Sequence, residues 1–331
     1  MTEYNADIAP AITIPAVDPI DLRMIALLHG NGRIASRDMA AQLGITETTV
    51  RARLRKLEQA DMLRVIAVTD FRAAGFDLLT AVGVHVEPCR AADVAQALAA
   101  LPQVLNVHLI AGTPALEISV AARNRAELAR LLGEDLLGID GVDRLEAGVA
   151  LDVVKLQWGR VPFLRTQRSE LEQALTRVGQ DELDNDLIAL LTQDARTSNR
   201  ELARRLDVAE GTIRTRLKRL LDENVIRITA ISNAHRLGHA HVAFLWIDVA
   251  DGAQPKAVAT ALAGLARIYY VATMLGRCDV LAVTLVENVA QLRAYIDDVI
   301  APLAGIRAVR HTQSTKFIKH DYRWMMILPE V

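Results

Sequence analysis

Residues 46 to 57 hold the residue types that could bind a nucleic acid, because four cations and one acid share a stretch with short hydroxyl side chains. Val50, Leu54 and Leu57 recur at helical spacing, which predicts a helix with one apolar face. The opposite face is small at its N-terminal end and cationic further along. Small groups can touch base edges in a major groove while cations reach phosphates. We therefore predict a DNA recognition helix whose contact residues are Thr48, Thr49, Arg51, Ala52, Arg55 and Lys56.

An amphipathic basic helix alone could be an ordinary core-packing helix with a solvated face, so the preceding elements matter. Residues 20 to 28 carry apolar positions at helical spacing, and His-Gly-Asn-Gly at 29 to 32 interrupts them. A second short helix is predicted over 36 to 43. Gly44 can end that helix, and Thr46 can cap the next one. This order predicts a helix-turn-helix domain.

The helix-turn-helix pattern occurs twice in the chain. Residues 21 to 68 align with residues 184 to 231 without a gap, and 17 of the 48 paired positions are identical. Ala209 takes the place of the threonine cap, whereas Ser198 and Glu201 predict a capping box before the second middle helix. The second recognition helix should therefore begin less firmly, by about 1 kcal/mol. The two helices share their cations but differ where bases would be read, so we expect different half-sites. The second set of predicted DNA contacts is Gly211, Thr212, Arg214, Thr215, Lys218 and Arg219.

After each helix-turn-helix the sequence alternates between strand-like and helix-like periods. In the first half, strands are predicted at 79–86, 104–111, 116–121 and 142–153, with helices at 91–101 and 125–137. In the second half, strands are predicted at 241–249, 268–275, 280–286 and 306–318, with helices at 255–265 and 289–300. Both orders are βαββαβ, a ferredoxin-like domain. The fold class is therefore α+β, with two winged-type helix-turn-helix domains and two ferredoxin-like domains in a tandem repeat. The predicted boundaries are 1–18 for a flexible arm, 19–70 and 183–232 for the helix-turn-helix domains, 75–160 and 238–325 for the ferredoxin-like domains, and 161–182 for a linker.

Composition and charge set outer limits on function. With 331 residues, 51% hydrophobic and 24% charged, the chain has the composition of a globular protein. We found neither a signal peptide pattern nor about 18 consecutive uncharged apolar residues, so we expect a cytoplasmic protein without membrane contact. Cys89 and Cys278 are expected to be buried free thiols, and no metal, cofactor or nucleotide-binding motif is indicated. The net charge of −2 argues mildly against a large nucleic-acid surface, but residues 46 to 57 alone carry +3.

A helix-turn-helix domain followed by a βαββαβ domain resembles the Lrp/AsnC family of transcription regulators, here as two full-length copies. The resemblance rests on the T-x-R-x-R-L-x-x-L run in both recognition helices and on Arg33 and Arg196 before the middle helices. The usual glycine after the recognition helix is replaced by Asp61 and Asn224, which can also adopt a left-handed backbone. Such regulators pair their ferredoxin-like (RAM/ACT-like) domains, so one fused chain resembles a whole dimer. The resemblance implies sequence-specific binding to double-stranded DNA and homo-oligomers of pseudo-dimeric chains.

The resemblance also implies a small-molecule effector, usually an amino acid, near the glycine turn between the middle strands of the βαββαβ domain. Gly276 and Asp279 could receive the carboxylate and the ammonium group of such a ligand. In the first domain Gly112 is present, but Ala115 replaces the acid, so we expect the effector mainly in the second domain and Glu117 uninvolved. The other interpretation is a plain hairpin turn in which Asp279 caps the backbone.

An enzyme is the main alternative, because siroheme decarboxylases resemble the same two-domain layout and some of them are fused. Such an enzyme needs ionisable side chains around a tetrapyrrole, although a histidine on a strand is more often a hydrogen-bonded structural residue. A third interpretation, an assembly module with vestigial helix-turn-helix domains, is disfavoured because both recognition helices are cationic. We therefore predict a regulator and not an enzyme. The candidate catalytic histidines are His85, His108, His239, His241 and His311.

Overall fold

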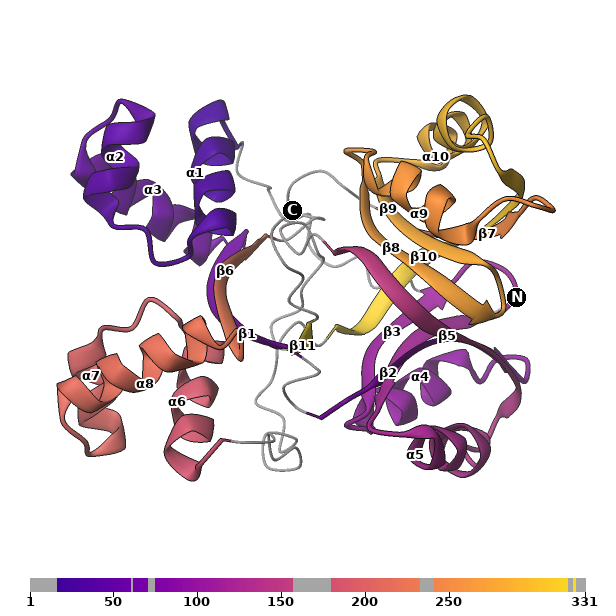
Figure 1. Cartoon of the computed structure of the whole chain (residues 1–331), viewed down its shortest axis with the longest axis horizontal. Coiled ribbons are helices and arrows are strands. Elements are labelled where there is room, and N and C mark those ends of the chain that lie inside the picture. The colour runs from indigo at the N-terminus through magenta and orange to yellow at the C-terminus, as the bar shows by residue number, and fades with distance from the viewer. Residues whose placement is uncertain are drawn as a thin grey trace, which may run out of the picture.

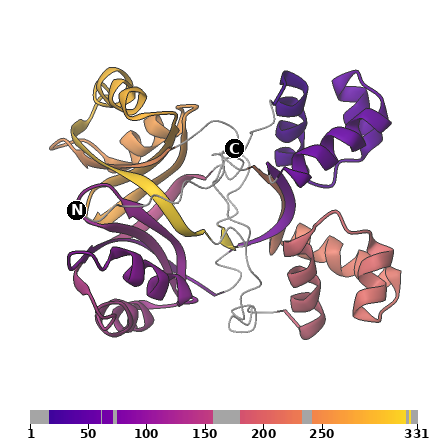
Figure 2. The ribbon, with the colours of Figure 1, turned by 180° about the vertical axis from the view of Figure 1, so that it is seen from behind.

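The computed structural model describes residues 17–60, 62–70, 75–156, 180–232, 241–320 and 324–325. The two helix-turn-helix domains lie together on one side of the molecule, and the two ferredoxin-like domains form the other side (Figure 1). The view from behind shows the same two lobes (Figure 2). The predictions for the arm before residue 17, for most of the linker, for His239 and for Asp61 fall outside the described residues.

The first helix-turn-helix domain has the predicted order of helices. Its elements are α1 (Pro19–Gly30), α2 (Ser36–Leu43) and α3 (Glu47–Gln59). α1 begins with a complete capping box in which Asp18 and Asp21 accept each other's backbone N–H. Gly44 ends α2 in the left-handed conformation, with φ 69°. Thr46 caps α3 by accepting the N–H of Thr49, so the predicted start of the recognition helix is confirmed.

The second helix-turn-helix domain repeats the first with different caps. Its elements are α6 (Glu182–Gln193), α7 (Asn199–Leu206) and α8 (Glu210–Asp222). Asp207 ends α7 in the left-handed conformation that Gly44 adopts in the first copy, and Asn224 adopts it after α8 as expected. Ser198 accepts the N–H of Glu201, but the Glu201 carboxylate binds two arginines of α7. Ala209 gives α8 no side-chain cap, as the sequence indicated.

A shared sheet joins the two helix-turn-helix domains. β1 (Leu63–Asp70) pairs antiparallel with β6 (Ile226–Ser232), and β11 (Trp324–Met325) adds to β1 in parallel. Each domain supplies one strand after its recognition helix, so the sheet forms between the halves. The apolar faces of all six helices pack with these strands into one hydrophobic core. The two domains therefore form one structural unit.

Two arginines, one from each helix-turn-helix domain, donate hydrogen bonds to the other domain. The Arg33 guanidinium donates to the carbonyl oxygens of Ala195 at 2.7 Å and Thr197 at 2.9 Å. It also donates to Asn199 Oδ1 at 3.0 Å. Arg196 makes the equivalent contact in the opposite direction, to a carbonyl oxygen in the loop after α1 at 3.0 Å. The pseudo-twofold relation expected from the repeat is thus present at the level of single hydrogen bonds.

The two ferredoxin-like domains close into one eight-stranded barrel. The first contains β2 (Leu78–Val86), α4 (Ala91–Ala100), β3 (Val104–Ile110), β4 (Leu116–Ala122), α5 (Arg125–Arg130), η1 (Leu131–Leu136) and β5 (Val142–Leu156). The second contains β7 (His241–Val249), α9 (Pro255–Ala263), β8 (Ile268–Gly276), β9 (Val280–Val286), α10 (Val289–Tyr295), η4 (Ile296–Ile300) and β10 (Ile306–His320). The strand order is β10-β3-β4-β2-β5-β8-β9-β7, so β5 pairs with β8 and β10 pairs with β3. The two βαββαβ domains are confirmed, and one chain forms the barrel that two copies would form.

Two features of these domains differ from the prediction. The single helices expected at 125–137 and 289–300 each end in a π-helical turn, η1 and η4. The wider turn lets Leu131 and Leu136, five residues apart, both point into the core. β5 and β10 are 15 residues long, which exceeds the predicted strands because their ends pair with the other domain.

The two cysteines have different environments. Cys278 is a buried free thiol as expected, and burial raises its pKa to about 12. The expectation for Cys89 was wrong, because it is exposed in the turn before α4, with φ 67°. Among the described residues, no helix is both long and apolar enough to cross a membrane.

Candidate nucleic-acid interface and effector site

The outward face of α3 carries the predicted DNA contacts. Thr48, Ala52, Arg55 and Lys56 are exposed, whereas Thr49 is half-buried beside its cap. The Arg51 side chain is 65% exposed and pairs with Glu47 one turn earlier. An exposed pair of this kind contributes little to stability, so Arg51 can exchange its partner for a phosphate. The exposed residues on this face of α3 are therefore accessible to a DNA groove.

The outward face of α8 is similar, but its cations have more intramolecular partners. Arg214 lies 3.5 Å from Glu210, and Lys218 pairs with Asp222. Arg219 pairs with the buried carboxylate of Asp184. Gly211 and Thr215 are exposed and Thr212 is half-buried. An open groove of about 440 Å³ lies along this face, lined by Arg214, Thr215, Lys218, Arg219, Asp222 and Glu223.

An arginine that sequence reasoning missed fixes each recognition helix to the first helix of its domain. Arg53 on α3 donates to Asp18 at 2.5 Å and to Asp21 at 2.9 Å. Arg216 on α8 makes the same contacts with the two aspartates at the start of α6. The N–H of Asp21 and the Arg53 guanidinium hold the pKa of Asp18 below its ordinary value. The identity of these positions in both copies was the available signal.

The two glycine turns of the candidate effector site lie in unlike surroundings. Both have positive φ, 128° at Gly112 and 116° at Gly276, and the hairpins are closed by equivalent backbone hydrogen bonds. No atom lies within 4 Å of the position that a Cβ on Gly112 would take. A Cβ on Gly276 would lie 2.7 Å from the carbonyl oxygen of Ala147, because this turn packs against β5. The open turn is thus the one in the first domain.

Asp279 takes part in the backbone of its own domain. Its Oδ2 accepts the N–H of Val249 at 2.7 Å, and its own N–H donates to Ile247. This contact agrees with the interpretation of Asp279 as a capping residue in a hairpin. Its carboxylate is only partly exposed.

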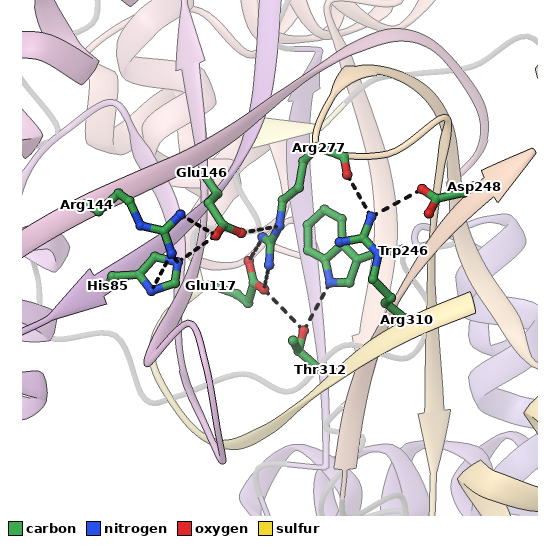
Figure 3. Close-up of polar contacts among 9 residues, drawn as sticks. All are labelled: His85, Glu117, Arg144, Glu146, Trp246, Asp248, Arg277, Arg310 and Thr312. Atoms are coloured by element: carbon green, nitrogen blue, oxygen red, sulfur yellow. Dashed lines mark hydrogen bonds and ion pairs between the residues drawn. The ribbon is translucent and has the colours of Figure 1, made fainter. Parts of the chain in front are cut away.

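A buried ion cluster next to this turn was not foreseen (Figure 3). Arg277 reaches from the second domain into the first and binds the Glu117 carboxylate with two hydrogen bonds, 2.6 and 2.7 Å long. The side chains are 6% and 2% exposed. The guanidinium also lies over Trp246, 3.8 Å from the ring centre, and Thr312 donates to Glu117 at 3.2 Å. Burial raises the pKa of Glu117, and the contact with Arg277 opposes that shift. Glu117 therefore has a structural role that the sequence did not indicate.

The candidate catalytic histidines do not share one site. His85 lies 2.9 Å from Glu146, which also pairs with Arg144. His108 is buried and lies 3.0 Å from the Ser314 hydroxyl. His241 and His311 lie on the outer face of their strands, because successive residues alternate in direction and their neighbours face the barrel interior. In the described part of the chain, no group of three or more His, Cys, Asp or Glu residues is placed to hold a metal ion.

Comparison with known proteins gives the family. Family models match as an AsnC-type helix-turn-helix domain at 17–58, an Lrp/AsnC ligand binding domain at 80–157, a winged helix-turn-helix DNA-binding domain at 180–227 and a C-terminal dimeric alpha+beta barrel domain at 248–327. An uncharacterised HTH-type transcriptional regulator of Pyrococcus abyssi is 33% identical over 147 residues, which are 44% of this chain and 92% of that protein. The chain belongs to the Lrp/AsnC family of transcriptional regulators. An uncharacterised HTH-type transcriptional regulator of Pyrococcus horikoshii is 32% identical over 157 residues, 45% of this chain and 99% of its own length.

These Lrp/AsnC relatives each match a length close to one of the two copies. The crystal structure of the siroheme decarboxylase NirDL matches the whole arrangement. The likeness covers 92% of this chain and 93% of that chain, with a TM-score of 0.64 and 16% sequence identity. At this identity the likeness shows a shared fold alone. A single Lrp/AsnC chain with two copies of each domain thus adopts a fold that is also seen in another protein.

Proposed function

We propose that this Lrp/AsnC chain is a cytoplasmic transcription regulator that binds one duplex DNA site with both recognition helices of its pseudo-dimer. The observation that carries this proposal is the pair of exposed cationic faces on α3 and α8, held in one unit by the Arg33 and Arg196 contacts. Docking of two such helices in successive major grooves requires half-sites about 34 to 36 Å apart or a multiple of that spacing. Fused chains are proposed to associate further into homo-oligomers.

The two half-sites should differ in sequence. Thr48 on α3 corresponds to Gly211 on α8, and Ala52 corresponds to Thr215, so the groups that would face bases are unlike. We expect duplex affinity to fall steeply with salt, and footprints of variants lacking one helix's contacts to show unlike half-site preferences. Thr48→Ala should change the preferred sequence more than the affinity. A salt dependence near zero would contradict the DNA-binding function, and identical half-site preferences would contradict the asymmetry.

The effector is proposed to be an amino acid or a similar small molecule at the turn of the second ferredoxin-like domain. The Gly276 turn adds the Asp279 carboxylate to its backbone, whereas the Gly112 turn offers only the backbone. Calorimetric titration with amino acids is expected to give about one tight site per chain. DNA and ligand should each change the affinity of the other, by about 1 to 3 kcal/mol.

Asp279→Asn is the sharpest test of that site. The amide oxygen can still accept the N–H of Val249, so the hairpin is kept while the negative charge is removed. We expect ligand binding to be lost in this variant and retained in Asp251→Asn, which removes an exposed carboxylate elsewhere in the same domain. Binding that survives in Asp279→Asn, or two equivalent sites per chain, would place the effector elsewhere.

We propose that the chain is not a siroheme decarboxylase despite the shared fold. The support is that His85 and His108 hold separate protein partners, and that Arg277 and Glu117 are buried against each other between the two domains. Mixing the protein with an iron tetrapyrrole and following absorbance is the direct test. We expect no spectral change at stoichiometric concentration, and conversion of the tetrapyrrole would overturn the proposal.

A further inference from the structure

The buried ion pair between Arg277 and Glu117 joins the two halves of the chain. Glu117 belongs to the first half of the chain and Arg277 to the second. Both are almost completely buried, and the guanidinium is held on one side by two hydrogen bonds and on the other by the Trp246 ring (Figure 3). Removing one partner of such a pair leaves a buried charge uncompensated and strongly lowers the stability. The intact pair, in contrast, is hardly more stable than two apolar side chains in its place.

Three cross-strand neighbours form a row across the sheet at the equivalent level of each half, and the two rows have different residues. In the first half, Gly83 is the cross-strand neighbour of both Glu117 and Glu146. In the second half, Trp246 is the cross-strand neighbour of both Leu281 and Arg310. The first row therefore carries two acids around a glycine, and the second carries an apolar residue and a cation around a tryptophan. The two rows are complementary to each other but not to themselves.

A barrel formed by two first halves would lack the cation. The turn that carries Arg277 in the second half has Thr113 at the corresponding place in the first, one residue after the glycine. Glu117 would then face a hydroxyl group and a proline ring, and its carboxylate would be buried without a counter-charge. The cost of that burial disfavours pairing of two first halves.

A barrel formed by two second halves would fail for two reasons. Arg277 would meet Leu281 in place of Glu117 and the half-exposed Arg310 in place of Glu146, so the buried cation would lose both carboxylates. It would also meet Trp246 where the first half has Gly83. A Cβ on Gly83 would already lie 2.8 Å from Arg277 Nη1, so a larger residue at that place would force the guanidinium to move away from its present partners.

Most contacts between the helix-turn-helix domains make no such distinction, except that Thr229 donates to the carbonyl of His29 and has Ile66 as its counterpart. The N–H of Gly32 donates to the carbonyl of Ile228, and the N–H of Ala195 donates to Val65 at the equivalent position. Arg33 and Arg196 likewise take the same position in the two copies. This part of the interface is close to self-complementary, so the larger difference between like and unlike pairs lies in the barrel.

We propose that the Glu117–Arg277 pair, with Gly83 and Trp246 beside it, makes each half of the chain select the opposite half and reject a copy of itself. The surface involved is the barrel face of one half, and its partner is the barrel face of the other half. Every pseudo-dimer then carries one α3 and one α8. This inference concerns pairing alone and does not rest on DNA binding or on an effector.

The test lets the halves choose their partners. A protease site is inserted into the full chain between residues 157 and 179, the folded protein is cleaved, and the cleaved complex is unfolded in urea and refolded. Native mass spectrometry then counts like and unlike pairs. Free choice gives unlike pairs in about half of the complexes, whereas we expect at least a tenfold excess of unlike over like pairs. A near-random mixture from the unaltered sequence would overturn the proposal.

The double variant Glu117→Leu/Arg277→Leu should relax the selection. Without a buried carboxylate, pairs of the first half are expected to rise at least tenfold, while Trp246 still disfavours pairs of the second half. The matched control is Asp152→Leu/Lys256→Leu, which removes an exposed ion pair that also bridges the halves, 3.3 Å long. Its partner choice is expected to stay as in the parent. Pairs of the first half that stay as rare in the Glu117/Arg277 variant as in the parent would also overturn the proposal.

Urea unfolding of the uncut chain gives a second measurement if the cleaved halves do not refold. Arg277→Leu strands the buried Glu117 carboxylate and should lower the folding equilibrium constant at least about a hundredfold. Glu117→Leu leaves Arg277 with Glu146 alone, 3.4 Å away, and should lower that constant by a smaller factor. The double variant should be more stable than either single variant. Single effects that simply multiply in the double variant would show that the two residues are not coupled.

Discussion

Replacing Arg33 by alanine is expected to lower the free energy of unfolding by about 2 to 3 kcal/mol, the amount lost when charged hydrogen bonds leave partly buried acceptors unpaired. Its guanidinium donates to two carbonyl oxygens and one amide oxygen of the second helix-turn-helix domain, so this domain loses a main anchor. The relative placement of α3 and α8 should loosen as well. Affinity for a DNA site with both half-sites should therefore fall more than affinity for one half-site. Urea unfolding and fluorescence anisotropy measure the two effects.

Two variants control for the loss of charge at Arg33. Arg33→Lys keeps the cation but lacks the planar fork that reaches three acceptors, so its stability should lie between those of the parent and Arg33→Ala. Arg37→Ala removes an exposed cation from α2 and should change stability by less than about 0.5 kcal/mol. An Arg33→Ala protein as stable as the parent would mean that the shared core alone holds the domains together.

Replacing Arg51, Arg55 and Lys56 together by alanine is expected to weaken duplex binding by about 500-fold at 0.1 M salt. Each phosphate contact contributes about 0.9 to the slope of log affinity against log salt. Relative to about 1 M salt, three contacts therefore raise the affinity at 0.1 M by about 2.7 decades, and the variant loses this gain. The slope itself should decrease by about 2.7. All three side chains are exposed on α3 and none of them packs in the hydrophobic core, so the unfolding transition should stay close to that of the parent.

The matched control removes the same number of charges from the barrel. Lys256, Arg293 and Arg307 are exposed cations of the second ferredoxin-like domain, and their triple alanine variant has the same net charge as the α3 variant. We expect it to bind DNA within a few-fold of the parent, with an almost unchanged salt slope. Equal losses in both triple variants would show that only the total charge matters and that α3 is not the contact surface.

The local signals in the sequence were sufficient for most helices and strands. Gly44, Thr46 and the apolar stripe of α3 gave the correct limits, because capping and one-sided burial involve residues within one or two turns. The βαββαβ order was also correct, since the change of apolar period is a local property. The π-helical turns were missed because they depend on which core the helix end has to fill.

The candidate site was predictable only in part. The exposed positions of α3 and α8 follow from the helical period, and the structure places them as expected. The turn at Gly276 was identified, but its packing against β5 was not, because that contact arises only when the two domains close the barrel. Cys89 was misjudged for a similar reason, since burial depends on the path of the turn and not on the residue type.

By itself the sequence determined the repeat, the fold class and the cationic recognition helices, since each of these is set by residue types at short, regular spacings. The tertiary structure decided which charges meet. Arg53, Arg33 and Arg277 have similar side chains, yet one fastens a helix, one joins two domains and one is buried against Glu117, 160 residues away in the chain. Interactions over such separations depend on the closure of a barrel and on the burial it produces, and burial sets how strongly a charge requires its partner.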